Sequence, residues 1–130
     1  TPVSIGRGTD FAFQVIGHSP VALGGFSFTP RSIKGAAANP KFKNTPVKGL
    51  DLRTANTRGL DLSYLITAYN KLSKNNITFF ERADFMDKLA GTNKLRLAIE
   101  AGQSERQIKQ SWQQGLAAFK KQRAPYLLYK

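Results

Sequence analysis

The chain of 130 residues contains no cysteine and a single histidine, His18. Without cysteine, neither a disulfide framework nor a thiolate metal site is possible, and one histidine cannot supply a histidine-rich metal centre. The apolar runs all fall short of the roughly 18 residues that a membrane-spanning helix needs, and no basic-then-apolar signal segment is visible. We therefore expect no metal, no cofactor and no membrane span.

Acidic residues are also scarce. Eight Asp and Glu stand against 20 Lys and Arg, which gives a formal net charge of +12 and a pI near 10.3. So large a surplus favours attraction to polyanions such as nucleic acid, anionic membrane surfaces or acidic cell-wall polymers. Charge alone does not choose among them. The hydrophobic content of 41% is enough for one domain with one core over residues 1–130.

The first half of the chain, to about residue 58, is rich in Gly, Pro, Asn, Thr and Phe. Short runs of strand-forming residues are separated there by turn formers. The predicted strands are Val3–Ile5, Phe11–Ile16, Phe26–Phe28 and Val47–Leu52. Residues 31–48 carry prolines and lysines with little periodicity, so we expect a long basic loop, which in a compact domain is usually functional or disordered.

From Leu60 onward the apolar residues recur with helical spacing. The predicted helices cover residues 60–74, 83–90, 93–101 and 104–124, and residues 77–80 form a short apolar run that suits a strand. Ser104 and Gln107 form a capping-box pattern, followed by an expected buried face of Ile108, Trp112, Leu116 and Phe119. Pro125 ends that helix, and Tyr126–Tyr129 forms a last strand or a packed tail. The fold class is therefore α+β, with a small mixed or antiparallel sheet packed against three to four helices.

The segment from Ser4 to His18 concentrates unusual features. Two glycines flank Arg7, then Thr9 and Asp10 follow, and the aromatic residues Phe11 and Phe13 come next. Glycines at these positions let the backbone adopt a positive φ or approach another surface closely. One interpretation is a tight turn with Arg7 and Asp10 as a local surface pair, which single-residue logic favours. The other is a functional presentation of a guanidinium, a hydroxyl and a carboxylate at a strand end.

A search for catalytic constellations finds no nucleophile elbow to partner His18, no Walker loop and no dinucleotide fingerprint. The carboxylates at and beyond residue 81 lie on or next to predicted helices, where solvated faces and first turns explain them, and Asp61 is expected to cap its helix. Asp10 and Asp51 remain, a weak basis for the paired carboxylates of a glycosidase. We expect no catalytic residue in this chain.

Lysines surround Phe42 in the basic loop, where its ring could stack on a nucleic-acid base. The lysines are Lys34, Lys41, Lys43 and Lys48. No RNP aromatics, Gly-x-x-Gly clamp or zinc finger accompanies them. Solvated basic surface is the favoured interpretation, and nucleic acid is the less favoured partner.

The ordered motifs of the whole chain resemble one family. They are Gly6-Arg7-Gly8-Thr9-Asp10, Val15-Ile16-Gly17-His18, Phe28-Thr29-Pro30, Asn39-Pro40-Lys41, Gly49-Leu50-Asp51-Leu52-Arg53, Leu60-Asp61-Leu62-Ser63-Tyr64, Phe85-Met86-Asp87-Lys88-Leu89-Ala90-Gly91-Thr92, Ile99-Glu100-Ala101-Gly102, Ser111-Trp112 and Tyr126-Leu127-Leu128-Tyr129. In this order they resemble the C-terminal part of the NamZ-type exo-β-N-acetylmuramidases, formerly a family of unknown function.

The resemblance implies a two-domain cell-wall glycoside hydrolase that releases N-acetylmuramic acid from the non-reducing ends of peptidoglycan fragments. Its Rossmann-like N-terminal domain would hold the catalytic acid and is absent here. The chain would then be the C-terminal domain, inactive alone, which helps to form the cleft. Its expected partners are that N-terminal domain and a muramic-acid-containing glycan, and its expected location is the bacterial cell envelope or the exterior.

Within that framework each residue of the segment has a predicted role. Arg7 suits the lactyl carboxylate of N-acetylmuramic acid, because arginine binds carboxylates in a bidentate way. Thr9 and Asp10 would form hydrogen bonds with sugar hydroxyls or orient Arg7. One of the two rings, Phe13 or Phe11, would pack on the sugar ring, and the other would belong to the hydrophobic core. His18 either lines the same cleft or is structural. The alternatives are a non-catalytic module for anionic polymers and a surface that only docks the missing domain.

Overall fold

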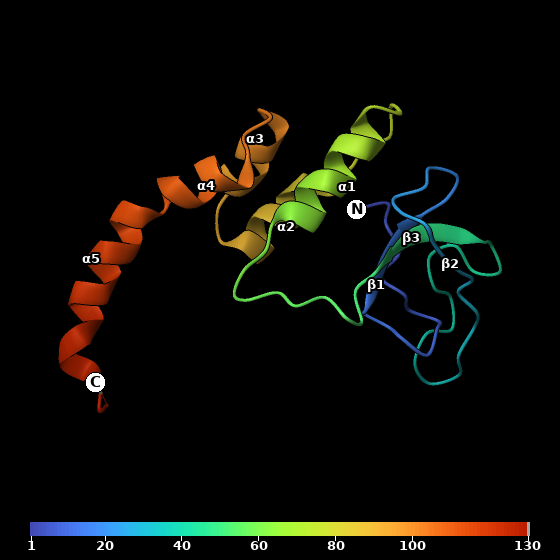
Figure 1. Cartoon of the computed structure of the whole chain (residues 1–130), viewed down its shortest axis with the longest axis horizontal. Coiled ribbons are helices and arrows are strands. Elements are labelled where there is room, and N and C mark those ends of the chain that lie inside the picture. The colour runs from blue at the N-terminus through green and yellow to red at the C-terminus, as the bar shows by residue number, and fades with distance from the viewer. Residues whose placement is uncertain (130) are drawn as a thin grey trace. The chain divides into compact units, whose positions relative to one another are not determined.

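Three short strands and five α-helices form the regular structure of the computed structural model, which describes residues 1–129 (Figure 1). The strands are β1 (Val15–His18), β2 (Phe26–Phe28) and β3 (Val47–Asp51). The helices are α1 (Ser63–Ser73), α2 (Ala83–Ala90), α3 (Lys94–Glu100), α4 (Glu105–Ser111) and α5 (Gln113–Arg123), followed by the 3-10 turn η1 (Ala124–Tyr126). The chain divides into two compact units, residues 1–83 and the chain from residue 84 onward.

The strands form one antiparallel sheet in the order β1-β3-β2, which confirms the α+β class and the small antiparallel sheet. Gly49 of the central strand pairs with Gly17 on one side and with Phe26 on the other. The first unit holds this sheet and α1 as its one complete helix, whereas α3, α4 and α5 belong to the second unit.

Several predicted strands differ from the observed ones. The segment predicted as Phe11–Ile16 becomes a strand only at Val15 and continues to His18, because Phe13 has a φ of 67°, which no strand residue adopts. Val3–Ile5 is reduced to one bridge between Ser4 and Gly17.

The apolar run at residues 77–80 is a loop, not a strand. Phe79 and Phe80 are buried, and both rings lie against Tyr69 of α1, at centroid distances of 5.8 and 5.5 Å. The run serves to cover α1, whose Leu72 is fully buried.

The core beneath the sheet is a cluster of Val15, Phe28 and Val47, with Phe11, Phe26 and Phe42 packed against it. It joins all three strands and two of the loops. Burial of these aromatic rings supplies much of the hydrophobic stabilisation that so small a sheet can obtain.

The second unit is helical. Arg96 of α3 forms ion pairs with Asp87 of α2 at 2.8 Å and with Glu100 at 2.9 Å, and Ile99 and Ile108 are buried. The predicted capping box is confirmed, since the Ser104 hydroxyl accepts from the backbone of Gln107 while the Gln107 side chain accepts from the backbone of Ser104.

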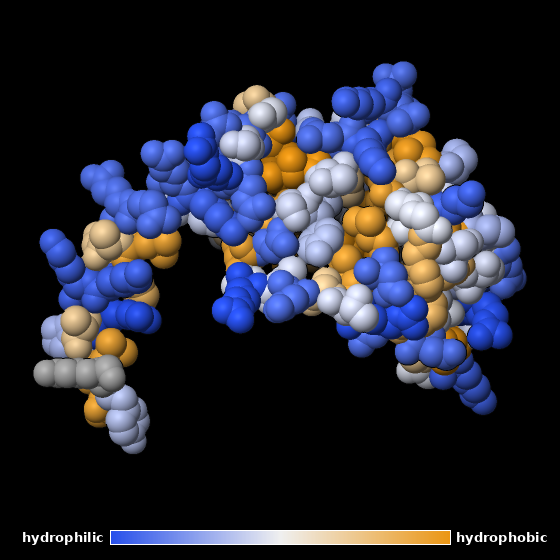
Figure 2. Space-filling view, in the orientation of Figure 1, coloured by the Kyte–Doolittle hydropathy of each residue, from blue (hydrophilic) through white to orange (hydrophobic). Residues whose placement is uncertain are grey.

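The predicted helix over residues 104–124 is broken at Trp112, which ends α4 and precedes α5. Of its expected buried face, Ile108 is buried and Trp112 is half-buried, whereas Leu116 and Phe119 are 45% and 56% exposed. Figure 2 shows apolar residues interspersed with hydrophilic ones along α5. Neither the last strand nor the packed tail expected at Tyr126–Tyr129 is formed, since η1 is followed by an exposed end at Leu127–Tyr129. None of the helices within residues 1–129 combines the length and apolar character of a membrane span.

Candidate functional site

The glycines on either side of Arg7 adopt left-handed conformations, with φ of 78° at Gly6 and 85° at Gly8. A Cβ added at Gly8 would lie 2.4 Å from the carbonyl oxygen of Arg31, whose backbone N–H donates to the Gly8 carbonyl at 2.8 Å. The expected positive φ and close approach are therefore both confirmed. They hold the turn that carries Arg7 firmly against the Arg31 segment.

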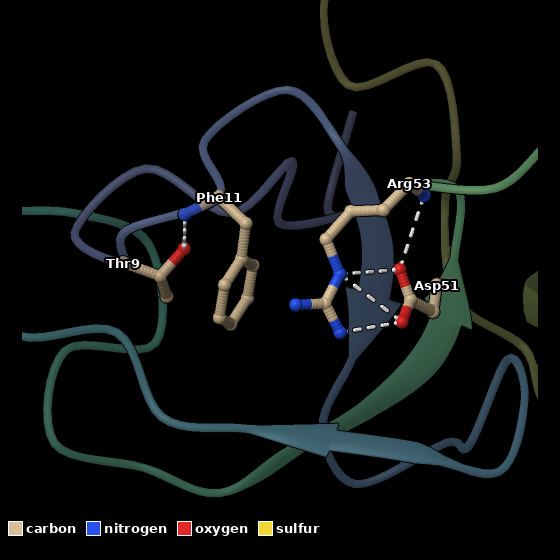
Figure 3. A network of polar contacts seen from close by, with 4 residues as sticks. All are labelled: Thr9, Phe11, Asp51 and Arg53. Atoms are coloured by element: carbon tan, nitrogen blue, oxygen red, sulfur yellow. Dashed lines mark hydrogen bonds and ion pairs between the residues drawn. The ribbon is translucent and has the colours of Figure 1, made fainter.

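The side chain of Thr9 stabilises this turn through two hydrogen bonds. Its hydroxyl donates to the Gly6 carbonyl at 2.6 Å and accepts from the backbone N–H of Phe11 at 3.3 Å, as Figure 3 shows. This is the local side-chain bonding by which Thr favours turns. The hydroxyl that was predicted to bond a sugar is thus already engaged in shaping the turn.

Arg7 and Asp10 are both exposed. Neither forms an ion pair with the other or with any further residue in the part of the chain that the structure describes. The Arg7 guanidinium lies over the ring of Phe13, 5.3 Å from its centroid, a cation–π contact. The alternative of a local Arg7–Asp10 pair is therefore not realised, and both charges remain available.

Phe11 and Phe13 have opposite environments, as expected for one core and one exposed ring. Phe11 packs edge-on against Phe26 and Phe28, at 5.7 and 6.1 Å. Phe13 is 65% exposed and has a φ of 67°, a conformation that costs an L-residue roughly 1–2 kcal/mol. A bulky apolar residue is thus held in solvent in a strained conformation.

Asp51 and Arg53 form a two-pronged ion pair at the end of β3 (Figure 3). The guanidinium also lies 5.1 Å from the Phe11 ring centroid and 5.3 Å from that of Phe26. Hydrogen bonds from Arg53 lower the pKa of Asp51 from 3.8 to about 2. A carboxyl that stays ionised in this way is not a general acid near neutrality, so Asp51 serves to anchor Arg53.

We expect a pH titration followed by carboxyl ¹³C NMR to give a midpoint for Asp51 near 2. Because the folded pKa is depressed, the stability that this ion pair contributes is present above the ordinary value of 3.8 and is lost as the pH falls through about 2. Arg53→Ala should return the midpoint to near 3.8. A wild-type midpoint that is unchanged by this substitution would contradict the assigned role of Arg53.

His18 lies at the opposite end of β1 from Phe13 and is 5% exposed. Its ring meets Phe42 edge-on at 5.1 Å, its Nδ1 has no hydrogen-bond partner among residues 1–129, and burial lowers its pKa. Burial and the Phe42 contact place His18 in the interior, but its Nδ1 is not satisfied as expected for a purely structural histidine, so its cleft-lining role stays a prediction. Phe42 packs on the core and on His18, so its ring is not free to stack on a base.

A hollow of about 350 Å³ lies next to Phe13. It is lined by Phe13, Gln14, Leu52, Ala55, Thr57, Gly59, Leu60, Asp61 and Tyr64. Apart from Phe13, sequence reasoning had proposed none of these as binding residues. Tyr64 is the one lining residue that the sequence could have indicated, because it is a large aromatic residue that lies off the apolar stripe of α1. The expected cap at Asp61 is not formed, because Leu62 is the N-cap residue of α1 and has no side-chain cap bond; Asp61 instead accepts from the backbone N–H of Ser63 at 2.8 Å, one residue ahead of the cap.

The family model described as "Exo-beta-N-acetylmuramidase NamZ, C-terminal" matches residues 1–129. The chain belongs to this family. A comparison with curated proteins gives no match. Among solved structures, this NamZ C-terminal domain is similar to a DUF1343 family protein from Bacteroides fragilis NCTC 9343, with 42% identity and a TM-score of 0.81. The match covers 100% of this chain and 37% of the other, so the domain spans little more than a third of that relative.

Proposed function

We propose that this NamZ C-terminal domain contributes part of the substrate cleft of an exo-β-N-acetylmuramidase, a glycoside hydrolase that releases N-acetylmuramic acid from the non-reducing ends of peptidoglycan fragments. Membership of the family supports the enzyme class, and the greater length of the solved relative supports a second, N-terminal domain. That domain would hold the catalytic acid, and the chain alone would be inactive. The site of action would be the bacterial cell envelope or the exterior.

The observation that carries the proposal is the exposed guanidinium of Arg7, which has no acidic partner among the described residues and stands on a rigidly built turn. N-Acetylmuramic acid bears a lactyl carboxylate, and an arginine fork binds a carboxylate through two parallel hydrogen bonds. Since no acidic side chain among residues 1–129 pairs with Arg7, a ligand carboxylate would not have to displace one. The free carboxylate of Asp10 on the same turn would accept hydrogen bonds from sugar hydroxyls.

We expect N-acetylmuramic acid to shift the backbone amide resonances of residues 7–13 in the labelled chain. Arg7→Ala should weaken this response about tenfold or more, as loss of a charged hydrogen-bonding partner does. Arg106→Ala is the matched control, because it removes an exposed arginine of the second unit and should leave the response intact.

The alternatives predict different titrations. A module for anionic polymers would lose affinity gradually with each lysine removed and would show a steep dependence on salt, with no special effect of Arg7→Ala. A surface that only docks the missing domain would give no shift with the sugar in a folded chain. Either pattern would contradict the proposed carboxylate site at Arg7.

A further inference from the structure

We infer that the hollow next to Phe13 is a subsite for the ring and acetamido group of an N-acetylated sugar, with Arg7 at its rim. The inference rests on the proposed function and assigns different parts of the sugar to the hollow and to Arg7. The hollow would bind the pyranose ring and its acetamido group. Arg7 would bind the lactyl carboxylate, which distinguishes N-acetylmuramic acid from other N-acetylated sugars.

The hollow has the size and the apolar walls that a single sugar residue requires. Its volume of about 350 Å³ lies at the lower end of the range for small-molecule sites, roughly 300–1,000 Å³. Phe13 and Leu60, which both line it, are 65% and 60% exposed. Large apolar groups gathered at one exposed place indicate a binding surface, and Tyr64 adds a second aromatic ring on which the apolar face of a pyranose can pack.

Three of the polar side chains that line the hollow have no hydrogen-bond partner in the part of the chain that the structure describes. The side chains of Gln14, Thr57 and Tyr64 make no hydrogen bond with any residue that the structure describes. Asp61, which also lines the hollow, accepts from the backbone of Ser63, and the nearby Thr9 hydroxyl and Asp51 carboxylate are likewise engaged. Gln14 carries both a carbonyl acceptor and an N–H donor, the pair that complements an acetamido group.

The backbone holds Phe13 in its strained conformation by bonds on both sides. The Phe13 N–H donates to the Ile5 carbonyl at 2.7 Å, and the Gln14 carbonyl accepts from Leu52 at 2.8 Å. Strain that the surroundings enforce in this way is concentrated at functional sites in proteins. It fixes the ring of Phe13 at the wall of the hollow and beneath the guanidinium of Arg7.

The other large groove lacks this character. It measures about 990 Å³, lies along α4 and is lined by Ser104, Glu105, Arg106, Lys109, Gln110 and Gln113. Its lining includes no aromatic residue and no residue with a wholly apolar side chain on which a sugar ring could pack. The hollow at Phe13 is therefore the better candidate, although it is the smaller of the two.

The test is a titration of the labelled 130-residue chain with N-acetylmuramic acid, N-acetylglucosamine and glucose. Both N-acetylated sugars should shift the amide and side-chain resonances of Phe13, Gln14 and Tyr64, whereas glucose should not. Gln14→Ala should weaken N-acetylglucosamine binding about five- to tenfold, the loss expected for hydrogen bonds of a neutral amide. Gln110→Ala, which alters the α4 groove, should have no effect.

Phe13→Gly provides a second variant that is expected to fold, because glycine adopts a positive φ without strain. It should abolish the response of the hollow to both N-acetylated sugars while the thermal melting curve is retained. If this variant binds as the wild type does, the hollow is not the subsite.

The two proposals fail in different ways. If N-acetylmuramic acid shifts only Arg7 and its turn, and N-acetylglucosamine shifts nothing, the hollow is overturned and the carboxylate site stands. If both N-acetylated sugars shift the hollow equally and Arg7→Ala changes neither affinity, the hollow stands and muramic-acid recognition by Arg7 is overturned. If glucose binds the hollow as well as N-acetylglucosamine does, acetamido recognition is overturned.

Discussion

Replacing Gly49 with alanine should prevent the sheet of the first unit from forming normally. Gly49 sits in the central strand β3 between β1 and β2. A Cβ there would lie 2.0 Å from the carbonyl oxygen of Ile16 and 2.6 Å from the Cα of Gly17. Both are backbone atoms of the neighbouring strand, so no side chain can rotate away. We expect a loss of about 3 kcal/mol or more in the free energy of unfolding.

Thermal unfolding followed by circular dichroism measures this loss as a drop of more than about 10 °C in the melting temperature. Gly25→Ala is the matched control, since no atom lies within 4 Å of a Cβ built there. A Gly49→Ala chain that melts like the Gly25→Ala chain would show that β1 and β3 separate more easily than their pairing indicates.

Replacing Phe28 with alanine should cost about 3–5 kcal/mol in the free energy of unfolding. Phe28 is 5% exposed and packs with Val15 and Val47 in the cluster beneath the sheet. Its ring also contacts Phe11, at 6.1 Å between centroids, and Phe11 lies under the guanidinium of Arg53. Loss of the Phe28 ring leaves a cavity under the whole aromatic cluster.

Phe13→Ala is the matched comparison, because it removes the same side chain from an exposed position of the same unit. It should change the unfolding free energy by less than about 1 kcal/mol and yet remove the sugar response. Chemical denaturation of both variants, analysed with a common m-value, measures the two losses in the free energy of unfolding. Equal losses at Phe28 and Phe13 would contradict the separation of core and binding roles.

Features that depend on a few neighbouring residues were determined by the sequence itself. The capping box at Ser104 needs only Gln107 three residues later, and the turn around Arg7 depends on its flanking glycines and on Thr9, because positive φ and side-chain bonds within a turn are local properties. The number of helices before residue 105 and the strands Phe26–Phe28 and β3 follow from periodicity in the same way. The motifs of the family also lie in the linear sequence, and residues 1–129 match its model.

Features that depend on partners distant in the chain were decided only by tertiary structure. The segment at Phe11–Gln14 has strand-forming residues, but a bond from the Phe13 N–H to Ile5 bends it into a turn. Phe79 and Phe80 read as a strand yet pack on Tyr69, because an apolar run does not specify which surface will bury it. Leu116 and Phe119 have the spacing of a buried helical face, but they stay 45% and 56% exposed.

The binding residues divide along the same line. Arg7, Asp10 and Phe13 are neighbours in sequence, so a local motif could suggest them together. Thr9 belongs to the same motif, but its hydroxyl is used by two hydrogen bonds within the turn. Gln14, Leu60 and Tyr64 come from different segments and meet only because the residues before β1, the loop after β3 and the start of α1 line one hollow. His18 belongs to the same motif, yet the packing of Phe42 takes it into the interior. Sequence determines which chemistry a segment carries, and packing between distant segments decides which of those groups face a ligand together.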